Sequence, residues 1–367
     1  MSTVAALSRR GHEITLLLPR GRDDPEVTTT QLKEYFGIDG DFLVQQLNSR
    51  WEGDALFRTA LWLRQCVRAL PPKKFDIFYS RIPAMIGLGS MSPIPFVTDH
   101  YKPWPDVYPV IAPLVRRTAR SPHCLGFIVH SRYAAGSYLR VGISPDQLLV
   151  AHNGVDDVRE SRPDKAQARA RLSLPPAQKI VAYAGRVNAS KGLDQVLALA
   201  ALMPEVLFLI IGSEGEGPVE KAASNHVNVW VVPWQTRAQL PVWLAAADVL
   251  VIPPSLEPLN VFGNCVLPIK LFDYLAAGRP ILAPVSPDTA ELLSHCTNAY
   301  LVPPVKPEAS VAALQLLFND TALSSQIACG ALEQARACTW DARAENIEGF
   351  LNQRLEHLAN FSPARGR

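Results

Sequence analysis

Short apolar runs alternate with segments of helical periodicity along nearly the whole chain, and this alternation restricts the possible folds most strongly. Such runs, bounded by turn residues, are typical of buried parallel strands, and the periodic segments between them are typical of connecting helices. The pattern therefore predicts an α/β fold with parallel sheets. With 367 residues, 48% hydrophobic and 19% charged, the chain is long and apolar enough for two such domains.

The expected strands form two groups. The first comprises Glu13–Leu18, Phe75–Tyr79, Pro95–Asp99, Leu125–His130 and Leu148–Ala151, and the second comprises Lys179–Ala184, Leu207–Ile211, Val227–Val232, Asp248–Pro253, Pro280–Ala283 and Ala299–Val302. Ser161–Gln178 lies between them and is rich in Pro, Arg and Ala, which is typical of a linker. We therefore predict domains at residues 1–160 and 179–350, a linker at 161–178, and a C-terminal helix or tail at 351–367.

The first group begins unusually. Val4–Arg10 has the character of a helix, and Gly11 follows it, before any strand has occurred. A doubly wound sheet normally starts with its central strand and a glycine-bearing turn, so both are expected to be missing from residues 1–160. A sheet without its central strand would expose unpaired backbone at two edges. We therefore expect the natural chain to start further upstream.

Charge and cysteine content exclude several classes of protein. The formal net charge of +2 gives no indication of a nucleic-acid partner. The six cysteines are scattered without CxxC or zinc-ligand spacing, which favours reduced thiols and predicts no metal site. The sequence shows no 18-residue apolar run and no signal peptide. These features predict a cytoplasmic protein.

Four motifs occur in order along the chain: Arg9–Thr15 (RRGHEIT), His152–Asp156 (HNGVD), Gly185–Gly192 (G-R-x(4)-K-G) and Lys270–Pro280 (KLFDYLAAGRP). They resemble the RRGHEVT step, the NGVD hinge, the donor signature and the KLFEYMAAGKP segment of bacterial family-four glycosyltransferases. The resemblance covers essentially the whole chain, with the motifs in the family's order. The chain thus resembles the retaining, glycogen-synthase-like glycosyltransferases.

The resemblance implies a GT-B architecture, in which two Rossmann-like, doubly wound domains face each other across a cleft. It also implies transfer of a hexose-type sugar from a nucleoside-diphosphate sugar to a glycan or lipid-linked acceptor, without a metal or other cofactor. The donor would lie mostly on the second domain. Closure about Asn153-Gly154 would exclude water.

The strongest candidates for donor chemistry are Arg186 and Lys191, framed by Gly185 and Gly192. They follow the first strand of the second domain, at the end where open α/β sheets bind ligands. Without a metal, the protein must supply positive charge to the departing diphosphate, and an arginine fork with a lysine point charge suits it. We predict that both residues are catalytic.

A second donor element is expected at the helix Leu267–Ala277. Its start would offer the N–H groups of Ile269 and Lys270 to phosphate, and Asp273 would accept hydrogen bonds from ribose hydroxyls. The first of the two glutamates of the family pattern is Cys265 here, which leaves the sugar undefined. Glu257 is either a substitute carboxylate or a solvated loop residue.

The nucleobase is expected beside Val232 and Pro233. Trp234 follows them directly and could stack on the base or equally fill an apolar gap.

The acceptor side is expected at strand ends of the first domain. We predict that His100 is a catalytic-site residue that contacts the sugar or acceptor, with a capping or loop role as the alternative. We assign Arg81 and Ser131, with His130, to the same edge. His100 is not predicted to be a general base, because the resemblance implies that the departing phosphate takes the acceptor proton. His12, His226 and His295 are expected to be ordinary surface or turn residues.

Membrane contact is a further hypothesis. Aromatic residues and arginines alternate over one expected helix, and a second basic helix follows: Trp51, Phe57, Arg58, Trp62, Arg64, Arg68, Arg116, Arg117 and Arg120. This pattern resembles the interfacial helices of lipid-acceptor enzymes and would permit peripheral contact with an anionic membrane. An amphipathic helix with buried aromatic residues and solvated arginines is the alternative.

Two other functions remain possible from the sequence. A GT-B sugar-nucleotide epimerase is one, although the G-R-x(4)-K-G motif argues against it. A non-catalytic or truncated relative that binds nucleotide or glycan is the other, favoured by Cys265 and by the missing first strand.

Overall fold

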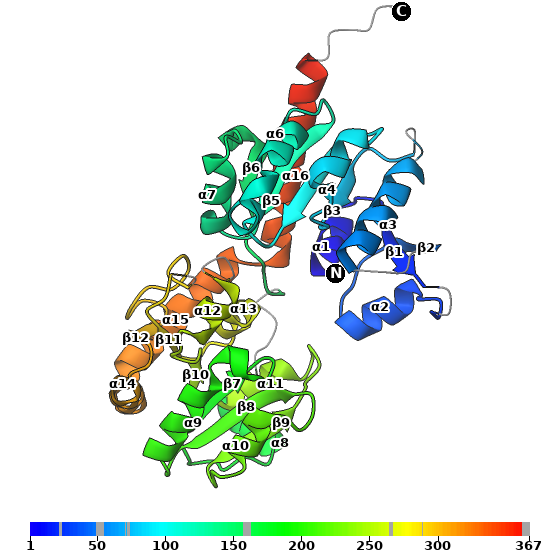
Figure 1. Ribbon diagram of the computed structural model, residues 1–367. Helices are drawn as coiled ribbons and strands as arrows, with labels where there is room; N and C mark the ends of the chain where they lie inside the picture. The colour runs from blue at the N-terminus through cyan, green and yellow to red at the C-terminus, as the bar shows by residue number, and fades with distance from the viewer. Residues whose placement is uncertain are drawn as a thin grey trace, which may run out of the picture. The chain divides into compact units, whose positions relative to one another are not determined.

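The computed structural model describes residues 1–21, 24–48, 55–69, 71, 74–156, 163–263, 267–287 and 289–361. The chain divides into two units, coloured by residue number in Figure 1. Unit 1 comprises Met1–His152 and Trp340–Arg367, and unit 2 comprises Asn153–Thr339. The chain therefore crosses between the units twice.

Unit 2 contains a six-stranded parallel sheet of the order β12-β11-β10-β7-β8-β9. Its strands are β7 (Ile180–Ala184), β8 (Leu207–Ser213), β9 (Val229–Pro233), β10 (Val249–Val251), β11 (Ile281–Pro284) and β12 (Tyr300–Val302). All six were predicted. The order is that of a doubly wound fold, and the winding direction reverses between β7 and β10.

Helices cover both faces of this sheet. They are α8 (Lys165–Arg171), α9 (Leu193–Leu202), α10 (Pro218–Ala223), α11 (Leu240–Ala246), α12 (Glu257–Phe262), α13 (Ile269–Ala276), α14 (Pro307–Asn319) and α15 (Thr321–Ala337). Along β8, Leu207 and Leu209 belong to one apolar core, whereas Phe208 belongs to the other. Burial on both faces explains the continuous apolar run of this strand. The segment predicted as a linker contains α8, which packs into unit 2 through Ala168.

Unit 1 contains a four-stranded parallel sheet, β3-β4-β5-β6, and a separate parallel pair, β1-β2. The strands are β1 (Ile14–Arg20), β2 (Phe42–Asn48), β3 (Phe78–Ser80), β4 (Phe96–His100), β5 (Cys124–Val129) and β6 (Leu148–Val150). The helices before α8 are α1 (Ser2–Arg9), α2 (Thr29–Phe36), α3 (Ala55–Ala69), α4 (Met85–Leu88), α5 (Trp104–Val107), α6 (Ala112–Ala119) and α7 (Arg132–Arg140). The strand β2 was not predicted, because Gln45 and Gln46 interrupt its apolar pattern.

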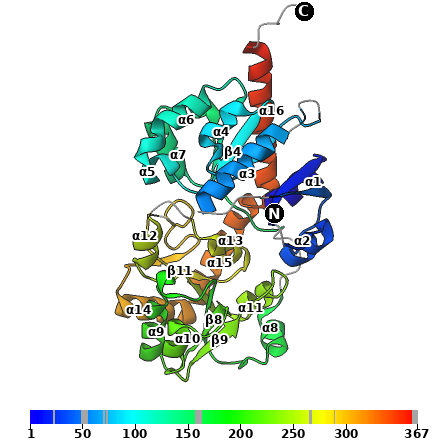
Figure 2. The same cartoon turned by 45° about the vertical axis from the view of Figure 1, so that its right-hand side comes forward.

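The last helix, α16 (Trp340–Phe361), belongs to unit 1. Its residues Ile347 and Phe350 join the core formed with Val97 and Leu125 of the four-stranded sheet. Figures 1 and 2 both show α16 running along this sheet. The prediction that the second domain extends to residue 350 is therefore wrong, because the apolar face of α16 is buried on the other unit.

The helix α3 covers part of the predicted membrane segment. Trp62 is buried, whereas Arg64 and Arg68 are exposed, as the amphipathic-helix interpretation expects. Trp51 and the side chains of Phe57 and Arg58 lie outside the described residues. Arg116 and Arg117 lie in the last turn of α6, and Arg120 is its C-cap residue. Among the described helices, none has both the length and the apolar character needed to cross a bilayer.

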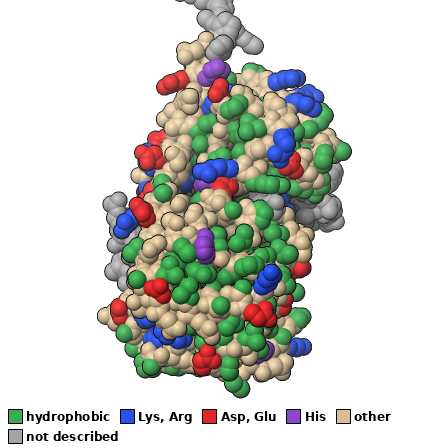
Figure 3. All heavy atoms as spheres, turned by 90° about the vertical axis from the view of Figure 1, so that its left-hand side faces the viewer, with side chains coloured by type: hydrophobic (Ala, Val, Ile, Leu, Met, Phe, Trp, Pro, Cys, Tyr) green, Lys and Arg blue, Asp and Glu red, His purple; other side chains and the backbone are tan. Residues whose placement is uncertain are grey.

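The described charges on the face drawn in Figure 3 are mixed in sign. Basic and acidic side chains lie interspersed there, rather than gathered into one basic patch. That face therefore offers no concentrated positive surface to a polyanion.

Candidate functional site

The loop that follows β7 is held in place by two glycines. Gly185 has φ +139°, and a Cβ there would lie 3.0 Å from the Nζ and Cε of Lys270 on α13. Gly192 has φ +69°, and a Cβ there would lie 2.2 Å from the Cβ of Ser255, which follows β10. The positive φ favours glycine at both positions, and the close approach to Ser255 adds a steric reason at Gly192. The loop is thereby fitted between the carboxyl end of β10 and the start of α13.

Three basic side chains gather around this loop. Lys270 places its Nζ 3.5 Å from the ring centroid of Tyr183. Burial, and then the charge of Lys191, lowers the pKa of Lys270 well below its usual value. Burial, and then the charge of Arg186, lowers the pKa of Lys191. Besides burial, Arg186 thus disfavours the charged form of Lys191, and Lys191 disfavours that of Lys270, so a bound anion would relieve both effects.

The first turn of α13 adds backbone donors. Its N-cap is Pro268, which provides no side-chain cap, and the Ile269 side chain is exposed. Among the described residues, the N–H groups of Ile269 and Lys270 have no hydrogen-bond acceptor. The helix is anchored to β7, because the Tyr274 hydroxyl accepts a 2.7 Å hydrogen bond from the N–H of Ala184. Free N–H groups beside lysines suit a phosphate group.

We expect diphosphate binding to be coupled to proton uptake at Lys270. An anion beside this amine favours its charged form, so binding raises a pKa that the empty site depresses. Titration calorimetry of a nucleoside diphosphate above pH 7, in buffers of different ionisation enthalpy, should show net proton uptake. The Lys270→Met variant should lose that uptake. Uptake of the same size in this variant would contradict the assignment to Lys270.

Asp273 lies one turn further along α13. Burial raises its pKa to about 6, an effect opposed by Arg237 and reinforced by Asp156. Arg237 and Asp156 form an ion pair of 2.5 Å. At neutral pH Asp273 is therefore mainly a carboxylate, which can accept hydrogen bonds from two hydroxyl groups.

Replacing Asp273 by asparagine is expected to stabilise the protein at pH 7 and to weaken nucleotide binding. Because the folded pKa of about 6 exceeds the unperturbed 3.8, folding favours the protonated form. Stability is therefore lost as the pH rises from about 4 to about 6, and the uncharged amide avoids roughly 1–3 kcal/mol of that loss. Denaturant titrations at pH 4 and pH 7 should show the gain at pH 7 only. An equal gain at both values would contradict the assigned pKa.

The residues predicted beside the nucleobase differ in exposure. Val232 is buried in the core of unit 2, so its side chain is not available to a base. Pro233 and Trp234 are exposed, and the N–H of Trp234 donates to Ser213 O at 2.8 Å, at the carboxyl end of β8. Glu257 is exposed at the start of α12, and Cys265 lies outside the described residues.

In unit 1, His100 ends β4 and is only 1% exposed. Its Nδ1 lies 2.6 Å from the Tyr138 hydroxyl, and its buried Nε2 has no hydrogen-bond partner among the described residues. Burial is the main cause that lowers its pKa to about 4. His100 is therefore neutral at pH 7.

A buried polar cluster surrounds the neighbouring Asp99. Its carboxylate accepts from the Tyr79 hydroxyl at 2.6 Å, from His130 Nε2 at 2.7 Å and from Arg343 Nη2 at 2.8 Å. The Nε of Arg81 lies 3.6 Å away. Burial alone would raise the pKa of Asp99, but Arg343, followed by His130 and Arg81, holds it well below its usual range. Asp99 is thus ionised at neutral pH.

Arg343 of α16 was not singled out from the sequence. Its Nη1 donates to the carbonyl oxygens of Ala151 and His152, the latter at 3.0 Å. Arg343, near the start of α16, thus links Asp99 to the two residues that follow β6. The available signal is its place just after Thr339-Trp340-Asp341, a segment that weakly resembles the family-four glycosyltransferases.

The remaining predicted residues have structural roles. Ser131 caps α7, since its hydroxyl accepts from the N–H of Ala134 at 3.1 Å. His12 pairs with Glu348 at 3.4 Å, His226 lies in the turn after α10, and His295 Nδ1 accepts from the N–H of Leu301 at 3.0 Å. The three histidines lie at the surface or in turns, as expected. The hydrogen bond of Ser131 accounts for its burial without a ligand.

Comparison with known proteins agrees with this geometry. Residues 164–334 match the family described as glycosyl transferases group 1, and residues 1–159 match Glycosyltransferase Family 4. The chain belongs to the group 1 glycosyltransferases. Curated relatives include two proteins named D-inositol 3-phosphate glycosyltransferase. The protein from Jonesia denitrificans is 26% identical, and the match covers 64% of this chain and 55% of that protein. The protein from Mycolicibacterium gilvum is 29% identical, and the match covers 56% of this chain and 46% of that protein. This glycosyltransferase chain spans about half the length of the curated relatives it matches.

Solved structures share the fold. Sucrose-phosphate synthase from Thermosynechococcus elongatus has a TM-score of 0.73 at 18% identity and covers 97% of this chain and 92% of its own. Anabaena HepE, solved in complex with UDP, has a TM-score of 0.72 at 16% identity, with coverage of 96% and 94%. The glycosyltransferase described here therefore has the GT-B type of α/β fold, with two Rossmann-like units.

Proposed function

We propose that this protein is a retaining glycosyltransferase that moves a hexose-type sugar from a nucleoside-diphosphate sugar to a glycan or lipid-linked acceptor. The observation that carries the proposal is the convergence of Arg186, Lys191 and Lys270 on the loop after β7. This loop lies at the carboxyl end of the strand where the winding of the sheet reverses, the usual ligand position in such folds. Family membership supports transfer chemistry.

In the proposed mechanism, the sugar–phosphate bond breaks as negative charge grows on the diphosphate. Arg186 and Lys191 stabilise that charge, and the N–H groups at the start of α13 hold the phosphate. Asp273 orients the ribose through its hydroxyl groups. The leaving phosphate takes the proton of the acceptor hydroxyl, so no protein base is needed. The positive charges that a divalent metal would otherwise supply come from side chains.

Neutral His100 is proposed to contact the sugar or acceptor through Nε2, with Arg81 beside it. Two observations support this role: the nitrogen is buried without a partner among the described residues, and Tyr138 fixes the ring through Nδ1. A buried, unsatisfied nitrogen is costly unless a ligand uses it. His100→Gln should therefore impair transfer more than it impairs UDP binding.

The test is product analysis with purified protein in EDTA. UDP-glucose, the nucleotide sugar found with HepE, is a first donor, alongside the corresponding GDP sugar, with inositol phosphate, a glycan and a lipid extract as acceptors. NMR coupling constants of the new glycoside should show the anomeric configuration of the donor. Inverted product would overturn the retaining assignment, and epimerised donor without transfer would favour an epimerase. A strict requirement for added divalent metal would overturn the metal-free mechanism.

A further inference from the structure

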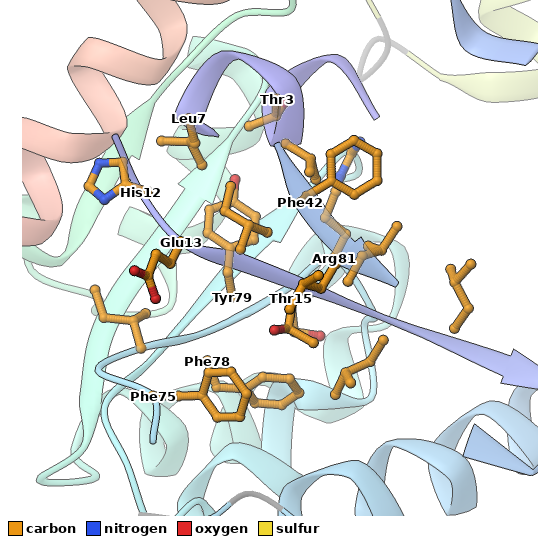
Figure 4. A pocket seen from close by; sticks show the side chains of 18 of the residues that line it. Thr3, Leu7, His12, Glu13, Thr15, Phe42, Phe75, Phe78, Tyr79 and Arg81 are labelled. Atoms are coloured by element: carbon orange, nitrogen blue, oxygen red, sulfur yellow. The ribbon is translucent and has the colours of Figure 1, made fainter. Parts of the chain in front are cut away.

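His100 and Asp99 are consecutive on β4, so their side chains point to opposite faces of the sheet. Tyr79 and Arg81 contact Asp99, and both of these residues also line the groove drawn in Figure 4. His100 and Tyr138 are not among the described residues that line this groove. Within the described part of the chain, the His100 side chain has one hydrogen-bond partner, which is Tyr138. The hydrogen bonding of His100 is thus separate from that of the polar cluster around Asp99.

Two aromatic neighbours hold the His100 ring. Its centroid lies 6.0 Å from that of Tyr138 on α7, with 24° between the ring planes, and 6.4 Å from that of Phe127 on β5. The rings of Phe127 and Tyr138 lie 5.2 Å apart, and both side chains are fully buried. Close packing of this kind leaves the imidazole little freedom to turn, so its two nitrogens keep distinct surroundings.

The 2.6 Å contact between His100 Nδ1 and the Tyr138 hydroxyl allows two arrangements of protons. Burial lowers the pKa of His100 to about 4, so the neutral ring carries a single N–H proton at pH 7. In the first arrangement, that proton is on Nδ1 and is donated to the hydroxyl oxygen. The hydroxyl proton of Tyr138 then lacks an acceptor, because His100 is the sole hydrogen-bond partner of this buried group among the described residues.

In the second arrangement, the Tyr138 hydroxyl donates to Nδ1 of His100, and the ring proton is on Nε2. This arrangement satisfies the hydroxyl proton and leaves one buried polar group fewer without a partner. The difference favours the second arrangement by roughly tenfold, because an unsatisfied buried donor is costly.

We propose that Tyr138 is a positioning residue that keeps the proton of His100 on Nε2, so that His100 offers an N–H donor to its ligand. Nε2 is buried without a partner among the described residues, and such a donor is costly until a ligand accepts from it. The ligand atom must then be an acceptor, and the hydroxyl oxygen of a sugar fits, whereas an ammonium group does not. The identity of the ligand rests on the proposed function, whereas the position of the proton is a property of the free protein.

The experiment is long-range proton–nitrogen NMR of the full chain with nitrogen-15-labelled histidine at pH 7, without ligand. The protonated and unprotonated nitrogens of a neutral imidazole have well-separated chemical shifts, so the spectrum shows which nitrogen carries the proton. The chain has eight histidines, and His100→Gln identifies the signals of His100 by their absence. Tyr138→Phe removes the hydroxyl but keeps the ring against Phe127. Tyr133→Phe, at an exposed position of the same helix, is the matched control.

We expect the His100 proton on Nε2 in the unmodified protein and in Tyr133→Phe, and a mixture of both tautomers in Tyr138→Phe. In the transfer reaction, Tyr138→Phe should lower kcat by about 2- to 10-fold, the effect of one neutral hydrogen bond, and leave the affinity for UDP or GDP within about twofold. Tyr133→Phe should change neither quantity.

A proton on Nδ1 of His100 in the unmodified protein, or an unchanged tautomer in Tyr138→Phe, would overturn the proposal. An unchanged kcat in spite of mixed tautomers would overturn the donor role of His100 toward the ligand. The predicted tautomers in a protein without transfer activity would support the role of Tyr138 and count against the proposed function alone.

Discussion

Arg186→Ala is expected to weaken the binding of UDP or GDP by about 10- to 150-fold. A hydrogen bond to a charged group contributes about 1.5–3 kcal/mol, and an arginine fork facing a diphosphate makes such bonds. Arg186 lies in the loop after β7, outside the described helices and strands. Its loss should therefore leave the free energy of unfolding nearly unchanged. Titration calorimetry, with denaturant unfolding in parallel, measures both quantities.

Two matched variants sharpen this prediction. Arg186→Lys keeps the charge but loses the planar fork, so we expect an intermediate affinity. Arg171→Ala removes an exposed arginine at the end of α8, in the same unit, and should bind nucleotide like the unmodified protein. Equal losses in Arg186→Ala and Arg171→Ala would show that general surface charge, rather than a specific contact, attracts the nucleotide.

Arg343→Met is expected to destabilise unit 1 by about 3–5 kcal/mol. The variant leaves Asp99 charged and buried without its strongest cationic partner, and such isolated charges are costly. It also removes the donors to Ala151 and His152, where the chain leaves unit 1. Denaturant unfolding, followed by hydrogen exchange in β4 and β6, should locate the loss in unit 1.

A double-mutant cycle separates the ion pair from simple loss of packing. Adding Asp99→Asn to Arg343→Met removes the stranded charge, so the double variant should lose less stability than the two single variants together. Arg117→Met, an exposed change on α6, serves as the surface control. Strict additivity in the cycle would mean that Arg343 acts through packing, and that its contact with Asp99 contributes nothing of its own.

The fold of unit 2 could be predicted closely from the sequence, because its four inner strands are buried on both faces. Apolar runs such as Leu207–Ile211 contain no polar residue, so they indicate a buried strand clearly. The strand β2 escaped prediction for the opposite reason: its burial is partial, and glutamines interrupt it. A strand packed between two apolar layers therefore gives a clear pattern, whereas polar residues within β2 hide it.

The position of α16 and the role of Arg343 depend on tertiary contacts, which sequence patterns do not reveal. The amphipathic pattern of α16 indicates an apolar face but cannot say which unit buries it, and Ile347 and Phe350 in fact pack on unit 1. The role of Arg343 depends on that packing, so it could not be found from spacing. The glycines of the loop after β7 were identified from their motif, whereas the proximity of Lys270 to Tyr183 needed coordinates. Coordinates were also needed to show that Val232 lies in the core of unit 2 rather than beside a base.

The central claim is that the cations after β7 form a diphosphate site that works without metal. The most direct measurement is the Tm of the protein in EDTA, with and without UDP, GDP and their glucose conjugates, since binding to the native state stabilises it by mass action. A shift with one base, retained in EDTA and strongly reduced in Arg186→Ala, is the predicted result. The absence of any shift on folded protein, or a shift of equal size in Arg186→Ala, would contradict the account.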